Sequence, residues 1–318
     1  MIDRPDYIRP AGISLLDYLA LQGWRPVRDN GRDEVAGLCP LHRDSRASFY
    51  VNRRKQVFYC HGCGRGGGLA RLIRWLGDFT PPVTEHGQLM EDTYDFYRRQ
   101  LARWDDALAY LARRGIRDRA VIERMRIGYA PGACLRGYLT RLGYSREEPM
   151  VRGLVDERGR DCFFQCLTFP LAEADSLYGR SITNGLCRHR FLPGSKGGLY
   201  GWAPAAAFSR VIVVEGLFDV AALCQAGFDN AVAALGSHLN NLQLTQLCQM
   251  DERVTYICFD ADRNGGGPRA ARTLSIQLRH AGVEALRVEL PRGHDPASFF
   301  ASGASPCDFQ RCLDRARQ

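Results

Sequence analysis

Four cysteine and histidine residues near the N-terminus have the spacing of metal ligands. Cys39 and His42 are separated by two residues, as are Cys60 and Cys63, and 17 residues lie between the two pairs. Three thiolates and one imidazole complete the tetrahedral shell of Zn²⁺ and leave no position for water, so the pattern predicts one structural zinc ion. His61 is an alternative ligand. The two-residue spacing of Cys60 and Cys63 favours the cysteines, and we expect His61 to face outward.

A second set of thiols and imidazole occurs further along the chain as C-x3-C-x20-C-x-H. This spacing does not match a standard zinc knuckle, and free cysteine is often buried as a small apolar residue. We therefore expect no second zinc ion from Cys162, Cys166, Cys187 and His189.

The other candidates for chemistry are carboxylates in the C-terminal half. Glu215 follows the apolar run VIVV, Asp260 and Asp262 follow YICF, Asp219 lies one helical turn beyond Glu215, and Asp295 follows EALRVEL after a short turn. Oxygen ligands of this kind select Mg²⁺ or Mn²⁺. One or two such ions orient a nucleoside triphosphate and stabilise charge at the attacking and leaving oxygens. The structural alternative is that Glu215 and Asp260 only cap helices, since acids are favoured at helix N-termini.

The segments around these carboxylates form a regular series. Between 210 and 290, four apolar strand-like runs alternate with three helical segments. Strands that are apolar throughout and alternate with helices predict a doubly wound, mainly parallel sheet that is covered on both faces. Because ligands gather at the carboxyl ends of such strands, we expect the carboxylates to meet at one edge of the sheet.

The N-terminal half has a different pattern. Helices are expected over 13–22 and 69–76, with three short strands between them, and 91–113 predicts one long amphipathic helix or a helical pair. Short strands with glycine-rich turns follow over 150–201. The fold class is therefore α+β and α/β in several domains: a zinc-binding domain over 1–78, a proline-containing linker over 79–90, a mixed α+β subdomain over 91–205, the doubly wound domain over 206–300 and a tail over 301–318.

The hairpin between the two ligand pairs suits nucleic acid. Aromatic residues interleaved with basic ones fit stacking on single-stranded bases together with phosphate contact. Because side chains alternate between the two faces of a strand, one residue of each adjacent aromatic pair should instead cover the zinc core. The residues are Phe49, Tyr50, Phe58 and Tyr59, with Arg53, Arg54 and Lys55 at the turn.

The overall charge agrees with an anionic partner. The formal net charge is +8, nearly all of it from arginine, because lysine occurs only at Lys55 and Lys196. A basic surplus favours polyanions. The N-terminus has no basic start followed by an apolar signal core, and no apolar run approaches the ~20 residues of a membrane span. We therefore expect a cytoplasmic protein with no membrane association, whose cysteines are thiols or metal ligands.

Several motifs resemble those of a known family. VVEGLFDVAAL, AALGSHL, FDADRNGG and RGHDPASF, in this order and spacing, resemble the TOPRIM domain of bacterial DnaG-type primases. CPLH and FYCHGCGRGGG resemble the zinc-binding ribbon of the same proteins, and YLARRGIRDRAVIERMRIGYAP resembles their N-terminal polymerase subdomain. The resemblance covers roughly residues 10–300.

This resemblance implies roles for individual residues. Glu215 would be the central catalytic carboxylate and Asp260 and Asp262 the metal ligands, with Asp219 and Asp295 completing the acidic cluster. Among the basic residues it implies that Arg180 lines the template channel, that Lys196 lies near the incoming nucleotide, and that His189 and Arg190 belong to the same basic wall.

The chain also departs from the family pattern. Family members typically have a second acid two residues after the position of Asp295, where this chain has Ala297, so one ligand of an outer metal would be missing or replaced. The segment RHRFLPGSKGG is short and resembles primase-like proteins of mobile elements. Because the chain ends soon after the TOPRIM motifs, we expect it to lack the helicase-binding domain.

Three functions follow as hypotheses. The first is a primase that joins nucleoside triphosphates on a single-stranded DNA template, with a separate helicase or replication initiator as an expected partner. The second is a TOPRIM nuclease, because the same carboxylates and Mg²⁺ can cut phosphodiesters. The third is a non-catalytic single-strand-binding factor of a mobile element, which the departure at Ala297 favours.

Overall fold

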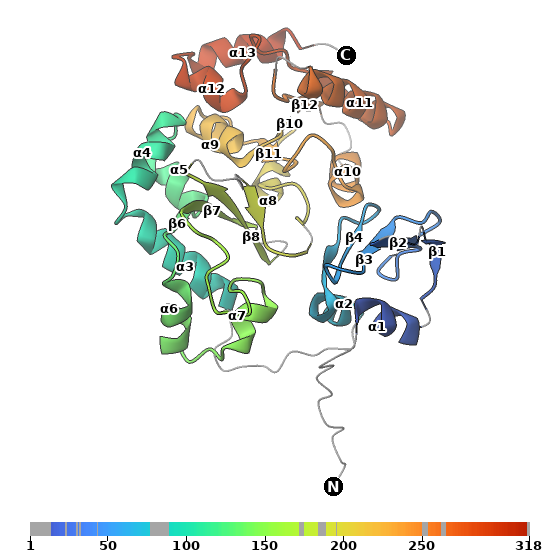
Figure 1. Ribbon diagram of the computed structural model, residues 1–318. Coiled ribbons are helices and arrows are strands. Elements are labelled where there is room, and N and C mark those ends of the chain that lie inside the picture. The colour runs from blue at the N-terminus through green and yellow to red at the C-terminus, as the bar shows by residue number, and fades with distance from the viewer. Residues whose placement is uncertain are drawn as a thin grey trace. The chain divides into compact units, whose positions relative to one another are not determined.

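The chain divides into two compact units, Met1–Pro82 and Val83–Gln318, each described here by itself (Figure 1). The computed structural model describes residues 14–76 and 89–316, apart from 23, 30, 32, 43, 172–174, 184–188, 195, 250–253 and 262–264. Asp262 and Cys187 therefore lie outside the described residues, as does the linker predicted over 79–90 except for its last two positions. Among the helices within these ranges, none is both long and apolar enough to span a membrane.

The first unit is a small antiparallel sheet with two short helices. Its elements are α1 (Leu15–Leu21), β1 (Pro26–Asp29), β2 (Glu34–Gly37), β3 (Phe49–Asn52), β4 (Val57–Cys60), β5 (Gly66–Gly68) and α2 (Leu69–Trp75). The strands pair in sequential order. Phe49 and Phe58 stack on one another and pack with Leu15 and Leu72 in one core, so both helices close the same face of the sheet. The sequence did not predict β1, which is exposed throughout, or β5, which consists of three glycines.

The second unit begins with a helical layer on an antiparallel sheet. Its elements are α3 (Leu89–Leu101), α4 (Asp105–Arg113), α5 (Arg119–Arg124), β6 (Gly128–Ala130), α6 (Leu135–Arg141), α7 (Glu147–Val151), β7 (Cys166–Leu171), β8 (Ser176–Ser181) and β9 (His189–Phe191). The sheet has the order β6-β7-β8-β9, and α3 packs on β6 (Figure 1). The segment 91–113 forms the helical pair rather than one helix, because Trp104 adopts an extended conformation between α3 and α4.

The remaining elements build the parallel sheet that the alternating pattern predicts. They are α8 (Trp202–Ala205), β10 (Arg210–Val214), α9 (Leu217–Gln225), β11 (Ala231–Ala233), α10 (Asn241–Cys248), β12 (Val254–Ile257), α11 (Gly266–His280), β13 (Glu284–Arg287), α12 (Pro296–Ala301) and α13 (Pro306–Asp314). The strands are parallel in the order β11-β10-β12-β13. Ile212 and Val214 enter one core while Val211 and Val213 enter another, so β10 is buried on both faces.

The segment 301–318, which we treated as a tail, belongs in part to the core. Phe309 of α13 is fully buried and packs against Phe228 and Phe299. The same core contains Leu111 of α4 and Phe169 of β7. The ranges 91–205 and 206–300 therefore share one hydrophobic core within a single compact unit, which fixes the antiparallel sheet against the parallel one.

Candidate functional site

The four zinc-ligand candidates meet in the first unit. One ligand atom from each of Cys39, His42, Cys60 and Cys63 lies within 4.8 Å of the others. The Cys39 and Cys63 sulfurs are 4.0 Å apart, and the His42 Nδ1 lies 3.9 Å from the Cys60 sulfur. Edges of this length fit a tetrahedron around one Zn²⁺ with ligand distances of about 2.0–2.3 Å. The full set of four ligands makes this a closed structural centre.

Backbone N–H groups and neighbouring side chains orient these ligands. The N–H groups of Leu41 and Cys63 donate to the sulfurs of Cys39 and Cys60 at 3.4 Å, which stabilises the thiolate form. The Asp44 carboxylate accepts from the Cys39 N–H at 2.9 Å and from the Ser48 hydroxyl at 2.6 Å. Outer partners of this kind fix the ligand geometry. Asp44 carries no spacing signal, and the sequence did not reveal its role.

His61 does not belong to the ligand set. It is exposed, and its ring lies edge-on to Tyr50 and Tyr59, at centroid distances of 5.1 and 5.0 Å. Tyr50 and Tyr59 face one another across β3 and β4, while Phe49 and Phe58 are buried on the other face. The predicted alternation is therefore confirmed, and a half-exposed aromatic cluster of Tyr50, Tyr59 and His61 covers the outer face.

The basic residues of the hairpin turn are partly neutralised. Arg53 pairs with Asp29, and Arg54 pairs with Asp33 at 3.1 Å. Lys55 is exposed, and no carboxylate pairs with it within the described residues. A nucleic acid would have to compete with Asp29 and Asp33 for the two guanidinium groups. The aromatic cluster is therefore the stronger candidate contact of this unit.

In the second unit, Glu215 and Asp260 meet at the carboxyl ends of β10 and β12. The Asp260 N–H donates to Glu215 Oε1 at 3.2 Å, although 45 positions separate the two residues. Parallel pairing of β10 with β12 brings these strand ends side by side. The prediction that the two acids converge is confirmed. Asp262, predicted as a metal ligand beside Asp260, lies outside the described residues.

Asp219 and Asp295 join this edge through α9 and α12. The Asp219 carboxylate is 5 % exposed and accepts from the N–H groups of Gly216 at 3.2 Å and Ala297 at 3.1 Å. Asp295 caps α12, accepting from the Ser298 N–H at 2.6 Å. Ala297, where an acid was expected, is fully buried and contributes its backbone N–H to Asp219.

The negative charges of this edge act on one another. Burial raises the pKa of the Asp219 carboxyl well above its usual range, and the charges of Asp295 and Asp260 raise it further. The Ala297 N–H and the Arg114 guanidinium oppose that shift. Repelling carboxylates around a buried acid fit a divalent cation. Within the described residues, however, only the zinc centre brings three or more ligand atoms within 4.8 Å, so the acidic set is looser than the zinc set.

This charge cluster gives a pH prediction for the protein without added Mg²⁺. The folded chain keeps the Asp219 proton to higher pH than the unfolded chain, so the free energy of unfolding should fall as the pH rises above about 4. The fall should approach about 1.4 kcal/mol per pH unit where the unfolded chain has lost this proton and the folded chain still holds it. Urea unfolding of Asp219→Asn between pH 4.5 and 8 should show a flatter slope, and an unchanged slope would contradict this charge assignment.

The basic residues approach the acidic edge from the antiparallel sheet. Arg180 of β8 donates from Nε to the Tyr110 hydroxyl at 3.3 Å, and Tyr110 lies edge-on to Phe218 at 6.2 Å. The Arg114 guanidinium lies 5.1 Å from the centre of the Phe218 ring, with its Nη2 3.8 Å from Asp295. Contacts through Tyr110 of α4 and the adjoining Arg114 thus connect Arg180 with the acidic cluster. The sequence did not reveal the roles of Arg114 and Tyr110, because neither residue belongs to a motif that marks it.

His189 orients Arg180 rather than adding a positive charge. Arg180 Nη1 contacts His189 Nε2, and the Tyr178 hydroxyl lies 2.8 Å from Nδ1. A guanidinium can only donate, so Nε2 must accept and the ring is neutral with its proton on Nδ1. The strand register sets Arg180 opposite His189.

Arg190 points the other way, so the single basic wall predicted for His189 and Arg190 is divided. Adjacent residues of β9 face opposite sides of the sheet. Arg190 pairs with Gly179 of β8, and a Cβ on Gly179 would point at Phe163 and Cys166, so Arg190 lies on that face of the sheet. The buried Cys166 donates to the Phe164 carbonyl at 3.2 Å, and neither Cys166 nor Cys162 belongs to a ligand cluster among the described residues.

Lys196 is tied to the loop that follows β11. Its Nζ donates to the Leu235 carbonyl at 3.0 Å and lies 4.5 Å from the centre of the Phe191 ring. Burial lowers its pKa. The next residue of that loop, Gly236, donates its N–H to the Glu215 carbonyl at 3.1 Å. Lys196 thus stands beside the loop that borders Glu215, where it could meet an anionic group near the carboxylates.

Comparison with known proteins agrees with this arrangement of two units. A CHC2 zinc finger model matches residues 26–80, and a Toprim-like model matches residues 212–300. The DNA primase of Pasteurella multocida is 30% identical over 91% of this chain and 58% of the relative. That of Aquifex aeolicus is 28% identical over 82% of this chain and 59% of the relative. The chain thus spans between half and three fifths of the length of the curated relatives it matches.

Solved structures extend the similarity to the whole described fold. The zinc-binding and RNA polymerase domains of the Aquifex aeolicus primase align with a TM-score of 0.66 at 25% identity, covering 96% of this chain and 83% of that one. The E. coli primase catalytic core aligns with a TM-score of 0.61 at 27% identity over 74% of this chain and 80% of that one. The chain thus combines a CHC2 zinc finger with a Toprim-like domain, in that order. In both domains and in their order, the chain resembles bacterial, DnaG-type DNA primases.

Proposed function

We propose that this chain contains the zinc-binding and catalytic parts of a primase, which synthesises short primers on single-stranded DNA. The observation that supports this most strongly is the meeting of Glu215 and Asp260 at one sheet edge. Asp295 of the same edge pairs with Arg114, and Arg114 and Tyr110 both lie against Phe218. Tyr110 in turn accepts a hydrogen bond from Arg180 of β8. Carboxylates next to guanidinium groups suit a site that holds both metal-bound triphosphate and a phosphodiester strand. A structure of the DnaG primase catalytic domain bound to single-stranded DNA aligns with a TM-score of 0.61 and 27% identity.

The proposed chemistry is nucleotidyl transfer. The 3′-hydroxyl of one nucleotide attacks the α-phosphate of a nucleoside triphosphate, a phosphodiester bond forms, and pyrophosphate leaves. Glu215 would accept the hydroxyl proton, and Lys196 and Arg180 would hold the phosphates of the incoming nucleotide and the template. Asp260 and Asp262, with Asp219 and Asp295 nearby, would hold Mg²⁺ or Mn²⁺, which when bound neutralises charge on the attacking and leaving oxygens. With Ala297 in place of an acid, an outer metal would lack one ligand, and the proposal rests on the inner set of Glu215, Asp260 and Asp262.

One assay separates this function from the two alternatives. The protein is incubated with unlabelled single-stranded DNA, labelled ribonucleotides and Mg²⁺, and in parallel with end-labelled DNA. New labelled oligonucleotides support the primase. Shortened DNA would indicate a nuclease, and neither product would indicate a binding factor. Action in the cytoplasm, a helicase or initiator as partner and an origin in a mobile element stay predictions.

The aromatic cluster of the zinc unit gives a prediction for template binding. We expect Tyr50→Ala with Tyr59→Ala to weaken binding of a single-stranded oligonucleotide by about 10-fold or more, since each base stacked on an aromatic ring contributes about 1–3 kcal/mol. Fluorescence anisotropy measures this, with Tyr256→Phe on β12 of the other unit as a control that keeps its ring. Unchanged affinity together with bound zinc would show that the cluster does not stack on bases.

A further inference from the structure

The backbone segment that follows Lys196 is held by three side-chain amides from the start of α10. Each amide pairs with a different one of three consecutive residues, 197–199, and we call the three together the amide clamp. Asn240 donates from Nδ2 to the Gly197 carbonyl at 3.0 Å, Gln243 donates from Nε2 to the Gly198 carbonyl at 3.3 Å, and Gln246 accepts from the Leu199 N–H at 2.7 Å. The backbone that carries Lys196 is therefore fixed residue by residue.

Capping of α10 explains only part of these contacts. In the capping box at the start of α10, the Asn240 side-chain oxygen accepts from the Gln243 N–H at 2.9 Å, and the Gln243 Oε1 accepts from the Asn240 N–H at 3.0 Å. A capping box uses the side-chain oxygens alone. The Nδ2 and Nε2 groups remain as donors, and both are directed at the segment that follows Lys196.

Gln243 also holds the loop against which the Lys196 ammonium lies. Its Nε2 donates a second hydrogen bond, to the Ala234 carbonyl at 3.0 Å, and the side chain is 1 % exposed. The next carbonyl of that loop, at Leu235, accepts from the Lys196 Nζ at 3.0 Å. Leu235 has a φ of 59°, a left-handed conformation that a leucine keeps only where its surroundings hold it. One buried amide thus fixes both the segment that carries Lys196 and the loop that receives its ammonium.

The segment fits closely against the clamp. A Cβ at Gly198 would lie 2.5 Å from the Gln246 amide, so only glycine allows this approach, and Gly197 has a φ of 81°. On its other side, the loop that receives Lys196 reaches the acidic edge, where the Gly236 N–H donates to the Glu215 carbonyl at 3.1 Å. The clamp therefore fixes the position of Lys196 relative to Glu215.

We propose that Asn240, Gln243 and Gln246 are positioning residues for Lys196, which hold its ammonium where the phosphates of the incoming nucleoside triphosphate bind. The inference rests on the proposed function, which assigns Lys196 to those phosphates. A lysine ammonium lies on a flexible four-carbon stem, so its direction depends on the backbone from which it projects. A backbone that is already fixed lowers the cost of ordering this side chain when the nucleotide binds. The clamp should therefore act on nucleotide affinity, and only through Lys196.

The test is a double-mutant cycle on the full chain with its zinc, in which calorimetry measures the affinity for ATP with Mg²⁺. Lys196→Ala should weaken ATP binding by about 10-fold or more, since it removes a hydrogen bond to a charged group. Gln243→Met keeps the length of the side chain and removes both donors. It should weaken ATP binding by about five-fold when Lys196 is present and by less than about two-fold in the Lys196→Ala background, because residues that act through one another are not additive. Equal losses in both backgrounds, or no loss in either, would overturn the proposal.

A second pair of variants decides the question if the protein does not fold without the buried Gln243 amide. Gln246 is only half-buried and acts as an acceptor, so Gln246→Glu keeps the accepting oxygen and Gln246→Leu removes it. Gln246→Leu should raise both the Kd and the KM for ATP by about three-fold or more with little change in kcat, as expected when ground-state binding is lost. Gln246→Glu should restore the wild-type values. The control is Gln249→Glu, which adds the same charge at an exposed position outside the clamp. Equal KM values for the two Gln246 variants, or a fall in kcat alone, would overturn the proposal.

The inference and the proposed function fail by different results. Primer synthesis by the wild type, together with an ATP affinity that neither Lys196→Ala nor the clamp variants change, overturns the inference and leaves the proposed function standing. ATP binding that depends jointly on Lys196 and Gln243 supports the inference even where no primer is made, and in that case the proposed function alone is overturned.

Discussion

Replacement of Asp260 by alanine should reduce primer synthesis by more than about 100-fold while leaving the affinity for single-stranded DNA within about two-fold. Loss of one group that stabilises transition-state charge costs about 10²–10³ in rate. Asp260 lies beside Glu215, just after β12, and does not contact Arg180 of β8 or the aromatic cluster of the zinc unit in any hydrogen bond or ion pair found among the described residues. The Asp260→Ala variant should therefore lose primer synthesis but keep its affinity for single-stranded DNA.

The control for this variant is Asp229→Ala, which removes an exposed carboxylate that pairs with Arg124 at 2.7 Å on the same unit. Both proteins are compared for labelled product, for oligonucleotide affinity and for thermal unfolding. Synthesis retained by Asp260→Ala would refute the assignment of the acidic edge. Loss of DNA binding in parallel with synthesis would instead indicate that Asp260 supports the fold.

Loss of the zinc ligand Cys60 should unfold the first unit and leave the second folded. Zinc in a small domain contributes about 10–16 kcal/mol of apparent binding free energy, which exceeds what a core of this size supplies by itself. Cys60 is fully buried at the end of β4, where it pairs with Phe49 of β3. The Cys60→Ala protein should bind no zinc and should lose the protection of residues 15–75 from proteolysis.

Metal analysis and limited proteolysis measure this, with Cys248→Ala as the control, since Cys248 is exposed on α10 and far from any ligand in sequence. We expect one zinc per wild-type chain and none for Cys60→Ala. A folded, protease-resistant first unit in the zinc-free variant would contradict the structural role of the metal.

The sequence predicted those parts of the site that depend on local pattern. The spacing of Cys39, His42, Cys60 and Cys63 revealed the zinc centre, because both ligand pairs lie in short turns. The apolar runs before Glu215 and Asp260 revealed their meeting, because parallel strands end at one edge. Both are confirmed by the geometry.

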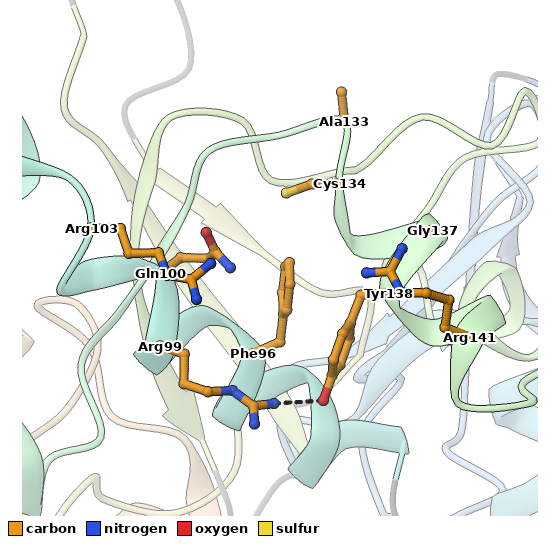
Figure 2. Close-up of a pocket in the computed structure, with 9 residues that line it drawn as sticks. All are labelled: Phe96, Arg99, Gln100, Arg103, Ala133, Cys134, Gly137, Tyr138 and Arg141. Atoms are coloured by element: carbon orange, nitrogen blue, oxygen red, sulfur yellow. Dashed lines mark hydrogen bonds between the residues drawn. The ribbon is translucent and has the colours of Figure 1, made fainter.

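Other features depend on how helices pack and could not be predicted from one sequence. The link from Arg180 through Tyr110 to Phe218, and from Arg114 to Asp295, requires α4 to pack against α9 and α12. The stacking of Phe96 on Tyr138 likewise requires α3 to pack against α6 (Figure 2). The division of His189 from Arg190 depends on strand β9, which is too short for an alternating pattern to be recognised.

The same distinction explains Ala297. From the sequence, Ala297 is recognised only as a position where an expected acid is absent. In the fold its N–H donates to the buried Asp219, and its side chain packs in the core shared by the two sheets. A backbone N–H group thus helps to position the acidic edge, and a sequence motif does not reveal a backbone contact of this kind.

The most direct test of the account is pyrophosphate release on an unprimed template. The protein is mixed with single-stranded DNA, four ribonucleoside triphosphates and Mg²⁺, and both pyrophosphate and the nucleotide joined into product are measured. Nucleotidyl transfer at Glu215 and Asp260 predicts one pyrophosphate for each phosphodiester bond formed, and none with Asp260→Ala. Cleavage of the template without pyrophosphate, or no turnover by a zinc-loaded protein that binds the template, would contradict it.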